Sequence, residues 1–158
     1  MTDDEAIRAW FAERIPDSWF PEPPEVSVDS DEIVVVGSLP ATGGREDRTT
    51  GFREETREQR MRIAAEAERR FGRKVSWGIE VGGRRRLFTT LALPVMTRLR
   101  QRERHVLDTL IGAGVARSRS DALAWCVRLV GQHQAEWLTE LREALGAVER
   151  ARAKGPKA

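Results

Sequence analysis

Two arginines and two serines alternate directly before an apolar helical pattern, in the order Arg117, Ser118, Arg119 and Ser120. The first turn of a helix has unpaired N–H groups and a partial positive charge, and both attract a phosphate group. Arginine adds a planar fork of donors that matches two phosphate oxygens at once. The residue types and their spacing therefore predict that these four residues contact phosphate.

The same four residues also fit a purely structural role. Ser118 is followed three positions later by Asp121, which is the spacing of a capping box. Ser118 would accept a hydrogen bond from the Asp121 N–H, and Asp121 would accept one from the Ser118 N–H. Such a cap contributes about 1 kcal/mol and needs no ligand. The motif alone leaves both interpretations open, so the surrounding residues have to decide between them.

Charge is distributed unevenly along the chain, although the net charge is only +2. Residues 1–50 carry 4 basic and 12 acidic groups, whereas residues 82–119 carry 9 arginines against Glu103 and Asp108. A basic stretch of this kind indicates a polyanionic partner, or a face that pairs with the protein's own acidic part. We expect Arg100 and Arg102 to join the phosphate contacts.

A run of three arginines, Arg84, Arg85 and Arg86, follows the Gly82-Gly83 pair in a predicted hairpin. Charges at the end of an exposed hairpin protect its edge from pairing with other chains. The same run is also a candidate for a secondary basic patch that contacts nucleic acid. Both interpretations are kept.

Several classes of protein are not expected. No apolar run approaches the roughly 20 residues of a membrane span, and the acidic N-terminus does not resemble a signal peptide. Cys126 is the only cysteine, which favours a reducing, cytoplasmic location. Cys126 and His133 lie seven positions apart, roughly on one helical face, but with no other cysteine and only His105 besides we expect no metal site and no cofactor. No arrangement of acid, base and nucleophile stands out, so we expect no catalytic residues and no enzymatic activity.

Hydrophobic periodicity predicts an α+β fold in which residues 1–92 form a small α-β-β-α-β-β layer domain. We expect a helix over 2–15 capped by Thr2, two strands within 25–38, a loop over 39–51, a helix over 52–71, and a hairpin that begins at residue 74. Residues 93–150 are predicted as a separate helical region, and residues 151–158 as a basic, disordered tail.

The helical region consists of a helix that ends near Gly112 and Gly114, followed by a long helical pattern from residue 120 to 150. Its apolar positions form a stripe close to a heptad repeat: Leu123, Val127, Val130, Trp137, Leu138, Leu141, Leu145 and Val148. Gly131 interrupts this pattern, and we expect a kink or a break there.

The stretch VMTRLRQRERHVLDTLIGAGVARSRSDALAWCVRLV, residues 95–130, resembles the ribbon-helix-helix family of DNA-binding proteins. The resemblance covers residues 94–135 and implies a homodimer in which two strands, one from each chain, form an antiparallel ribbon in the major groove. It places the strand over Val95 to Leu99, with Met96 and Arg98 outward against the bases. It also assigns Ser118, Arg119 and Ser120 to the DNA backbone.

An alternative exists for the start of this region. Val95, Leu99, Val106 and Leu110 also share helical spacing, so Pro94 could open one long helix over 94–111. That arrangement would give a helical hairpin in place of a ribbon.

We therefore expect a dimeric protein that binds double-stranded DNA, either a transcriptional regulator or a nucleoid-associated protein. Two alternatives remain. One is a protein-interaction module that keeps the helical dimer core and recruits a protein partner through the acidic N-terminal region. The other is an RNA-binding protein that uses the N-terminal α+β domain.

Overall fold

The computed structural model describes residues 3–42 and 45–155, and the chain divides into two units. Unit 1 comprises Met1–Pro94 and unit 2 comprises Val95–Ala158. The predicted mixed α+β class is confirmed, with helices in both units and the four-stranded sheet in unit 1. No helix within the described ranges is long and apolar enough to cross a membrane.

Unit 1 contains three helices and four strands among its described residues. Their bounds are α1 (Asp3–Arg14), β1 (Glu25–Val28), β2 (Glu32–Leu39), α2 (Arg45–Glu55), α3 (Arg57–Phe71), β3 (Lys74–Val81) and β4 (Arg84–Leu87). The strands lie in the order β1-β2-β3-β4, with β2 and β3 parallel and both outer pairs antiparallel. The parallel pair requires a crossover connection, which α2 and α3 provide.

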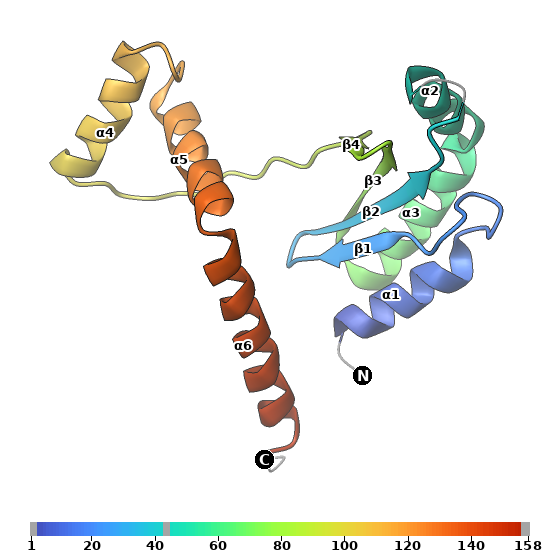
Figure 1. Cartoon of the computed structure of the whole chain (residues 1–158). Helices are drawn as coiled ribbons and strands as arrows, with labels where there is room; N and C mark the ends of the chain where they lie inside the picture. The colour runs from blue at the N-terminus through green and yellow to red at the C-terminus, as the bar shows by residue number, and fades with distance from the viewer. Residues whose placement is uncertain (1–2, 43–44, 156–158) are drawn as a thin grey trace. The chain divides into compact units, whose positions relative to one another are not determined.

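The core of unit 1 lies between one face of the sheet and helices α1 and α3, which run beside each other along it (Figure 1). Alternate residues of the central strands, such as Ile33, Val35 and Ile79, are fully buried and point to this face. Phe11 of α1 is also fully buried and packs edge to face against Trp77. The alternation of apolar residues in the strands thus determines which face receives the helices.

The predicted loop over 39–51 is wrong from residue 45 onward, because α2 begins at Arg45. The single helix predicted over 52–71 is also wrong, since Thr56 separates α2 from α3. Thr49 is buried at 7% exposure, so packing overrides the weak helix propensity of this stretch. At the break, the Arg60 guanidinium donates to the Thr56 hydroxyl at 2.9 Å and to the Arg53 carbonyl at 2.7 Å.

Unit 2 contains three helices among its described residues, α4 (Gln101–Gly112), α5 (Arg119–His133) and α6 (Ala135–Ala153). The turn between α4 and α5 uses Gly114 at a φ of 76°, in the left-handed region that glycine favours. The predicted long pattern breaks at Gln134, whose φ is −120° and ψ 28°, and not at Gly131.

The remaining predictions concern the segment before α4 and the two ends of the chain. The alternative helix over 94–111 is wrong, since α4 begins at Gln101 after an extended Arg100. The disordered tail over 151–158 is wrong for residues 151–153, which belong to α6. The Thr2 cap and residues 156–158 lie outside the described residues.

The substitution Gly37→Ala tests the packing of unit 1. A Cβ at Gly37 would overlap the ring of the buried Phe20, so we expect a loss of about 2 kcal/mol in the free energy of unfolding. Urea unfolding followed by tryptophan fluorescence measures it. Gly51→Ala is the control. Gly51 lies in α2, and an added Cβ would have Glu55 Oε1 as its nearest neighbour, at 4.0 Å. This substitution should stabilise the protein by up to about 1 kcal/mol. Equal stabilities of the two variants would contradict this packing.

Candidate nucleic-acid interface

The segment between β4 and α4 carries the predicted ribbon residues. Residues 89–100 form neither helix nor strand, and residues 89–98 take part in none of the hydrogen bonds recorded between described residues. Val95 is 85% and Met96 96% exposed. Val95, Thr97 and Leu99 are the side chains that would point inward on the predicted strand, and of these only Leu99 packs against the core of unit 2. Residues 95–99 form no strand in the single chain, so the ribbon stays a prediction.

Two hydrogen bonds between side chains and the backbone hold the beginning of α4. The Arg100 N–H donates to Glu103 Oε2 at 2.7 Å, and Arg104 Nη1 donates to the Leu99 carbonyl at 2.7 Å. Arg98, Arg100 and Arg102 are exposed. These contacts use the backbone of Arg100 and leave its guanidinium at the surface.

The predicted cap at α5 is confirmed in its first half. Ser118 Oγ accepts a hydrogen bond from the Asp121 N–H at 3.1 Å. The second half is wrong by one residue, because Asp121 Oδ2 accepts from the N–H of Arg117, at 3.0 Å, and not from that of Ser118. The backbone of Ser118 is extended, with a φ of −151° and a ψ of 167°, and in that conformation the Arg117 N–H is the one that meets the carboxylate.

Arg119 forms a two-pronged ion pair with Asp108 of α4. Its Nε and Nη2 donate to the two carboxylate oxygens at 2.8 and 2.9 Å. The hydrogen bonds from Arg119 lower the pKa of Asp108, and the same bonds raise the pKa of Arg119. The pair ties α5 to α4 through side chains that remain partly exposed. Two of the donors that a phosphate would need are therefore already bound.

The side chains of the other residues predicted to contact phosphate at this turn, Arg117 and Ser120, are more accessible to solvent. The Arg117 side chain is 96% exposed, with its Nε 3.9 Å from Asp121, and Ser120 is exposed as well. The sequence interpretation grouped the four residues as one clamp. The structure separates Arg119, which joins two helices, from Arg117 and Ser120, which face solvent.

Unit 2 buries few apolar side chains. Its buried cluster consists of Leu107, Ala116 and Ala122, with partly buried neighbours around it. Large apolar side chains at the surface of α5 and α6 are Val127, Leu129, Val130, Trp137, Leu141, Leu145 and Val148. Exposed apolar surface on this scale marks an interaction site. All of these positions except Leu129 belong to the apolar stripe that the helical pattern predicts.

The three arginines of the predicted secondary patch lie on β4, and they differ in their ion pairs. Arg85 forms ion pairs with Glu25 and Glu80. Arg84 and Arg86 form no ion pair with any residue that the structure describes. Sequence reasoning missed the neighbouring Arg53 and Arg60, which both lie over the Phe88 ring. Their helical spacing was the available signal.

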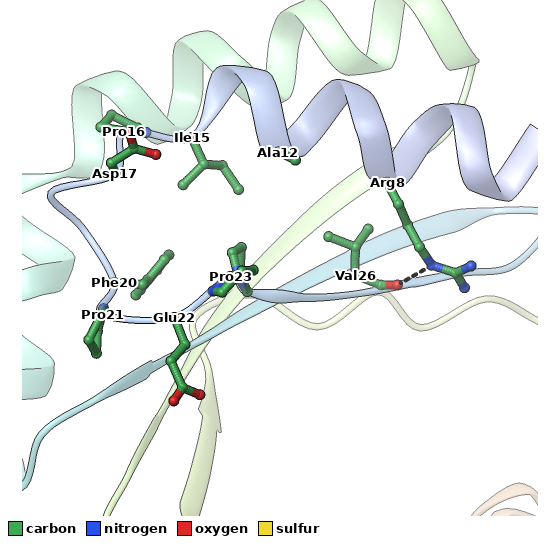
Figure 2. Close-up of a pocket in the computed structure, with 11 residues that line it drawn as sticks. Arg8, Ala12, Ile15, Pro16, Asp17, Phe20, Pro21, Glu22, Pro23 and Val26 are labelled. Carbon is green, nitrogen blue, oxygen red and sulfur yellow. Dashed lines mark hydrogen bonds between the residues drawn. The ribbon is translucent and has the colours of Figure 1, made fainter.

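Unit 1 also has a pocket of about 430 Å³ between α1 and the proline-rich segment before β1 (Figure 2). Its walls are mostly apolar and include Ile15, Phe20 and Val26. Arg8 reaches across one end, where its Nε donates to the Val26 carbonyl at 3.1 Å. Within the described residues, no group of three or more His, Cys, Asp or Glu side chains could hold a metal ion.

The ion pair between Asp108 and Arg119 gives a testable titration. In Arg119→Ala, the pKa of Asp108 should rise toward its ordinary value of 3.8, because its main hydrogen-bond partner is gone. The stabilisation from this pair is complete above that value and is lost as the pH falls through the lowered pKa of the folded protein. NMR titration of the Asp108 carboxyl measures the shift. Arg117→Ala should leave it unchanged, and an equal shift in both variants would contradict the pairing.

Comparison with known proteins assigns both units to a family. Residues 5–87 match the family described as Rv1265-like protein, N-terminal domain, and residues 100–152 match the Mb1296 C-terminal domain. The chain is 57% identical over 162 residues to uncharacterized protein Mb1296 of Mycobacterium bovis and to uncharacterized protein Rv1265 of Mycobacterium tuberculosis. Each alignment covers 98% of this chain and 72% of the relative. No solved structure matches the chain. With both units matched and most of each relative covered, the chain belongs to the Rv1265-like family.

Proposed function

We propose that this protein is a homodimer that binds double-stranded DNA, as a transcriptional regulator or a nucleoid-associated protein. One observation carries the proposal. Of the nine arginines in residues 82–119, only Arg85, Arg117 and Arg119 form an ion pair among the described residues. The other six are Arg84, Arg86, Arg98, Arg100, Arg102 and Arg104. Cations without internal partners attract a polyanion such as the DNA backbone.

The ribbon is the proposed reading element. The backbone groups of residues 95–98 form no hydrogen bond among the described residues, and these residues lie shortly before α4. Pairing with the same segment of a second chain would satisfy those groups and form a two-stranded ribbon of a width that fits the major groove. On such a ribbon, Met96 and Arg98 face the bases, while Val95 and Thr97 face the protein. Arg98 is the one strong hydrogen-bond donor on the outer face, so sequence preference is weak.

The exposed apolar side chains of α5 and α6 support a second copy as the partner. A unit whose buried cluster holds three small or medium side chains has little hydrophobic stabilisation of its own. Two copies that bring Val127, Val130 and Trp137 together would remove these side chains from water. Dimerisation then stabilises the fold of unit 2 as well as the ribbon.

The phosphate contacts are assigned around the ribbon. Arg100 and Arg102 flank it at the beginning of α4, and Arg117 and Ser120 lie at the beginning of α5. Arg119 acts through Asp108: it holds α5 against α4 and thereby positions the helix N-terminus. Asp121 occupies part of that terminus, so arginine side chains carry most of the attraction for phosphate.

The two alternatives have less support. A protein-interaction module predicts that acidic groups neutralise the basic stretch internally, whereas six of its nine arginines have no such partner within the described part of the chain. An RNA-binding unit 1 would need exposed aromatic rings for base stacking. The rings of Trp19, Phe52 and Phe88 pack against one another or against neighbouring rings.

DNA binding is tested with the double variant Arg98→Ala and Arg117→Ala. Removing two phosphate or base contacts from each chain of the dimer should weaken duplex affinity by about tenfold or more and make the salt dependence shallower by about 4 in log–log slope. Fluorescence anisotropy of a labelled duplex across a salt series measures both. The double variant Arg150→Ala and Arg152→Ala, in the last turn of α6, is the charge-matched control and should bind normally. Absence of duplex binding by the wild-type dimer at low salt would refute the function.

The ribbon is tested by two neighbouring substitutions, Val95→Asp and Met96→Asp. Both side chains are almost fully exposed in the single chain, so neither change should unfold it. On the ribbon, Val95 faces the protein and Met96 faces outward, so we expect Val95→Asp to shift the protein to monomer and Met96→Asp to leave the dimer intact. Sedimentation equilibrium measures this. Equal effects of both changes would argue against a ribbon.

A further inference from the structure

The three consecutive arginines of β4 lie on two different faces of the sheet. Arg85 pairs in register with Glu80, whereas Arg84 and Arg86 pair in register with Val81 and Ile79. Val81 and Ile79 are buried beneath the helices. Because side chains alternate along a strand, Arg84 and Arg86 lie on the helix side of the sheet edge. Arg85 lies on the opposite face, where Glu25 and Glu80 neutralise it.

Phe88 extends the helix side of this edge by one more position. Its N–H donates to the Trp77 carbonyl at 2.7 Å, which continues the β3–β4 pairing beyond β4. Phe88 therefore shares a side with Arg86. The guanidinium carbons of Arg60 and Arg53 lie 4.8 and 5.8 Å from the centre of the Phe88 ring. Arg53 and Arg60 of the helices thus lie at the same sheet edge as β4.

Arg60 is 93% removed from solvent, at 7% exposure, and no carboxylate pairs with it among the described residues. Its donors reach the Thr56 hydroxyl and the Arg53 carbonyl, which are neutral. Burial, and then repulsion from Arg53 and Arg57, lowers the pKa of Arg60. An uncompensated charge of this kind is costly. An anion held nearby would offset that cost and the repulsion between the arginines.

We propose that Arg53 and Arg57 of the helices, together with Arg84 and Arg86 on the helix side of β4, form a phosphate-binding surface on unit 1, here called the β4 arginine surface. It contacts backbone phosphates of the DNA duplex, and in this it rests on the proposed function. Arg60 is a positioning residue, because it holds the break between α2 and α3 and the Phe88 ring in place. Unit 1 thereby adds a second, sequence-independent contact beside the one assigned to unit 2.

The test compares arginine variants of the same strand in the full chain. Arg84→Ala with Arg86→Ala should weaken duplex affinity by about tenfold or more, with a log–log salt slope shallower by about 4 for the dimer. Arg85→Ala removes a charge from the same strand but from the neutralised face, and should stay within about twofold of wild type. All three side chains are exposed, and thermal unfolding by circular dichroism checks that the fold is unchanged.

A second arm separates failure of this surface from failure of the proposed function. Wild-type binding of the duplex with no loss in the double variant overturns the β4 arginine surface and leaves the function standing. If wild type binds no duplex, calorimetric titration with inorganic tripolyphosphate decides: binding that the double variant loses supports the phosphate surface without DNA, and no binding overturns it. A loss confined to single-stranded RNA, with duplex affinity intact, overturns the assignment to DNA.

Discussion

Unit 2 has to fold around a buried cluster of three side chains, Leu107, Ala116 and Ala122. Such a cluster removes little apolar surface from water, while ordering three helices costs conformational entropy at every residue. The ion pair between Arg119 and Asp108 adds a link between α4 and α5, but it is partly exposed and screened by salt. The apolar side chains that remain at the surface are therefore the largest reserve of stabilisation. In the proposed dimer, assembly and folding of unit 2 depend on the same contacts.

The acidic and basic parts of the sequence are less distinct in the folded protein than in the composition, because some of their charges are paired. The acidic excess of residues 1–50 is partly used inside unit 1, where Asp3 pairs with Arg73 and Glu25 with Arg85. Carboxylates at those sites are occupied by structural partners. Among the described residues, the cations without such partners include the arginines before and within α4 and Arg84 and Arg86 of β4. In the proposed complex, arginines of either unit can contact the polyanion, whereas in the minimal arrangement only the ribbon and the helix N-terminus contribute.

The serine cap at α5 shows how one motif can combine structural and functional demands. Ser118 satisfies an N–H that would otherwise lack a partner, and Asp121 orders the turn through the Arg117 N–H. This order fixes the direction of the backbone from which the Arg117 side chain extends into solvent. The carboxylate lowers the positive potential at the helix end, so the motif is a well-ordered scaffold for arginine more than a phosphate site made from N–H groups.

Local patterns in the sequence determined much of this protein. They predicted the mixed α+β class, the strand alternation that produces the sheet, the Ser118 cap and the basic character of residues 82–119, because each depends on neighbours a few residues apart. Tertiary structure decided what depends on distant partners. Thr49 is buried within a helix where the local sequence predicted a loop. Arg119 is paired with Asp108, eleven positions earlier. Arg85, unlike its two neighbours, is neutralised by carboxylates on β1 and β3. The meeting of Arg53 and Arg60 with Phe88 likewise required the crossover that lays α2 and α3 against β3. The sequence determines the charge on each arginine, but packing determines whether that charge is neutralised, because an ion pair requires a carboxylate within a few ångströms of the guanidinium.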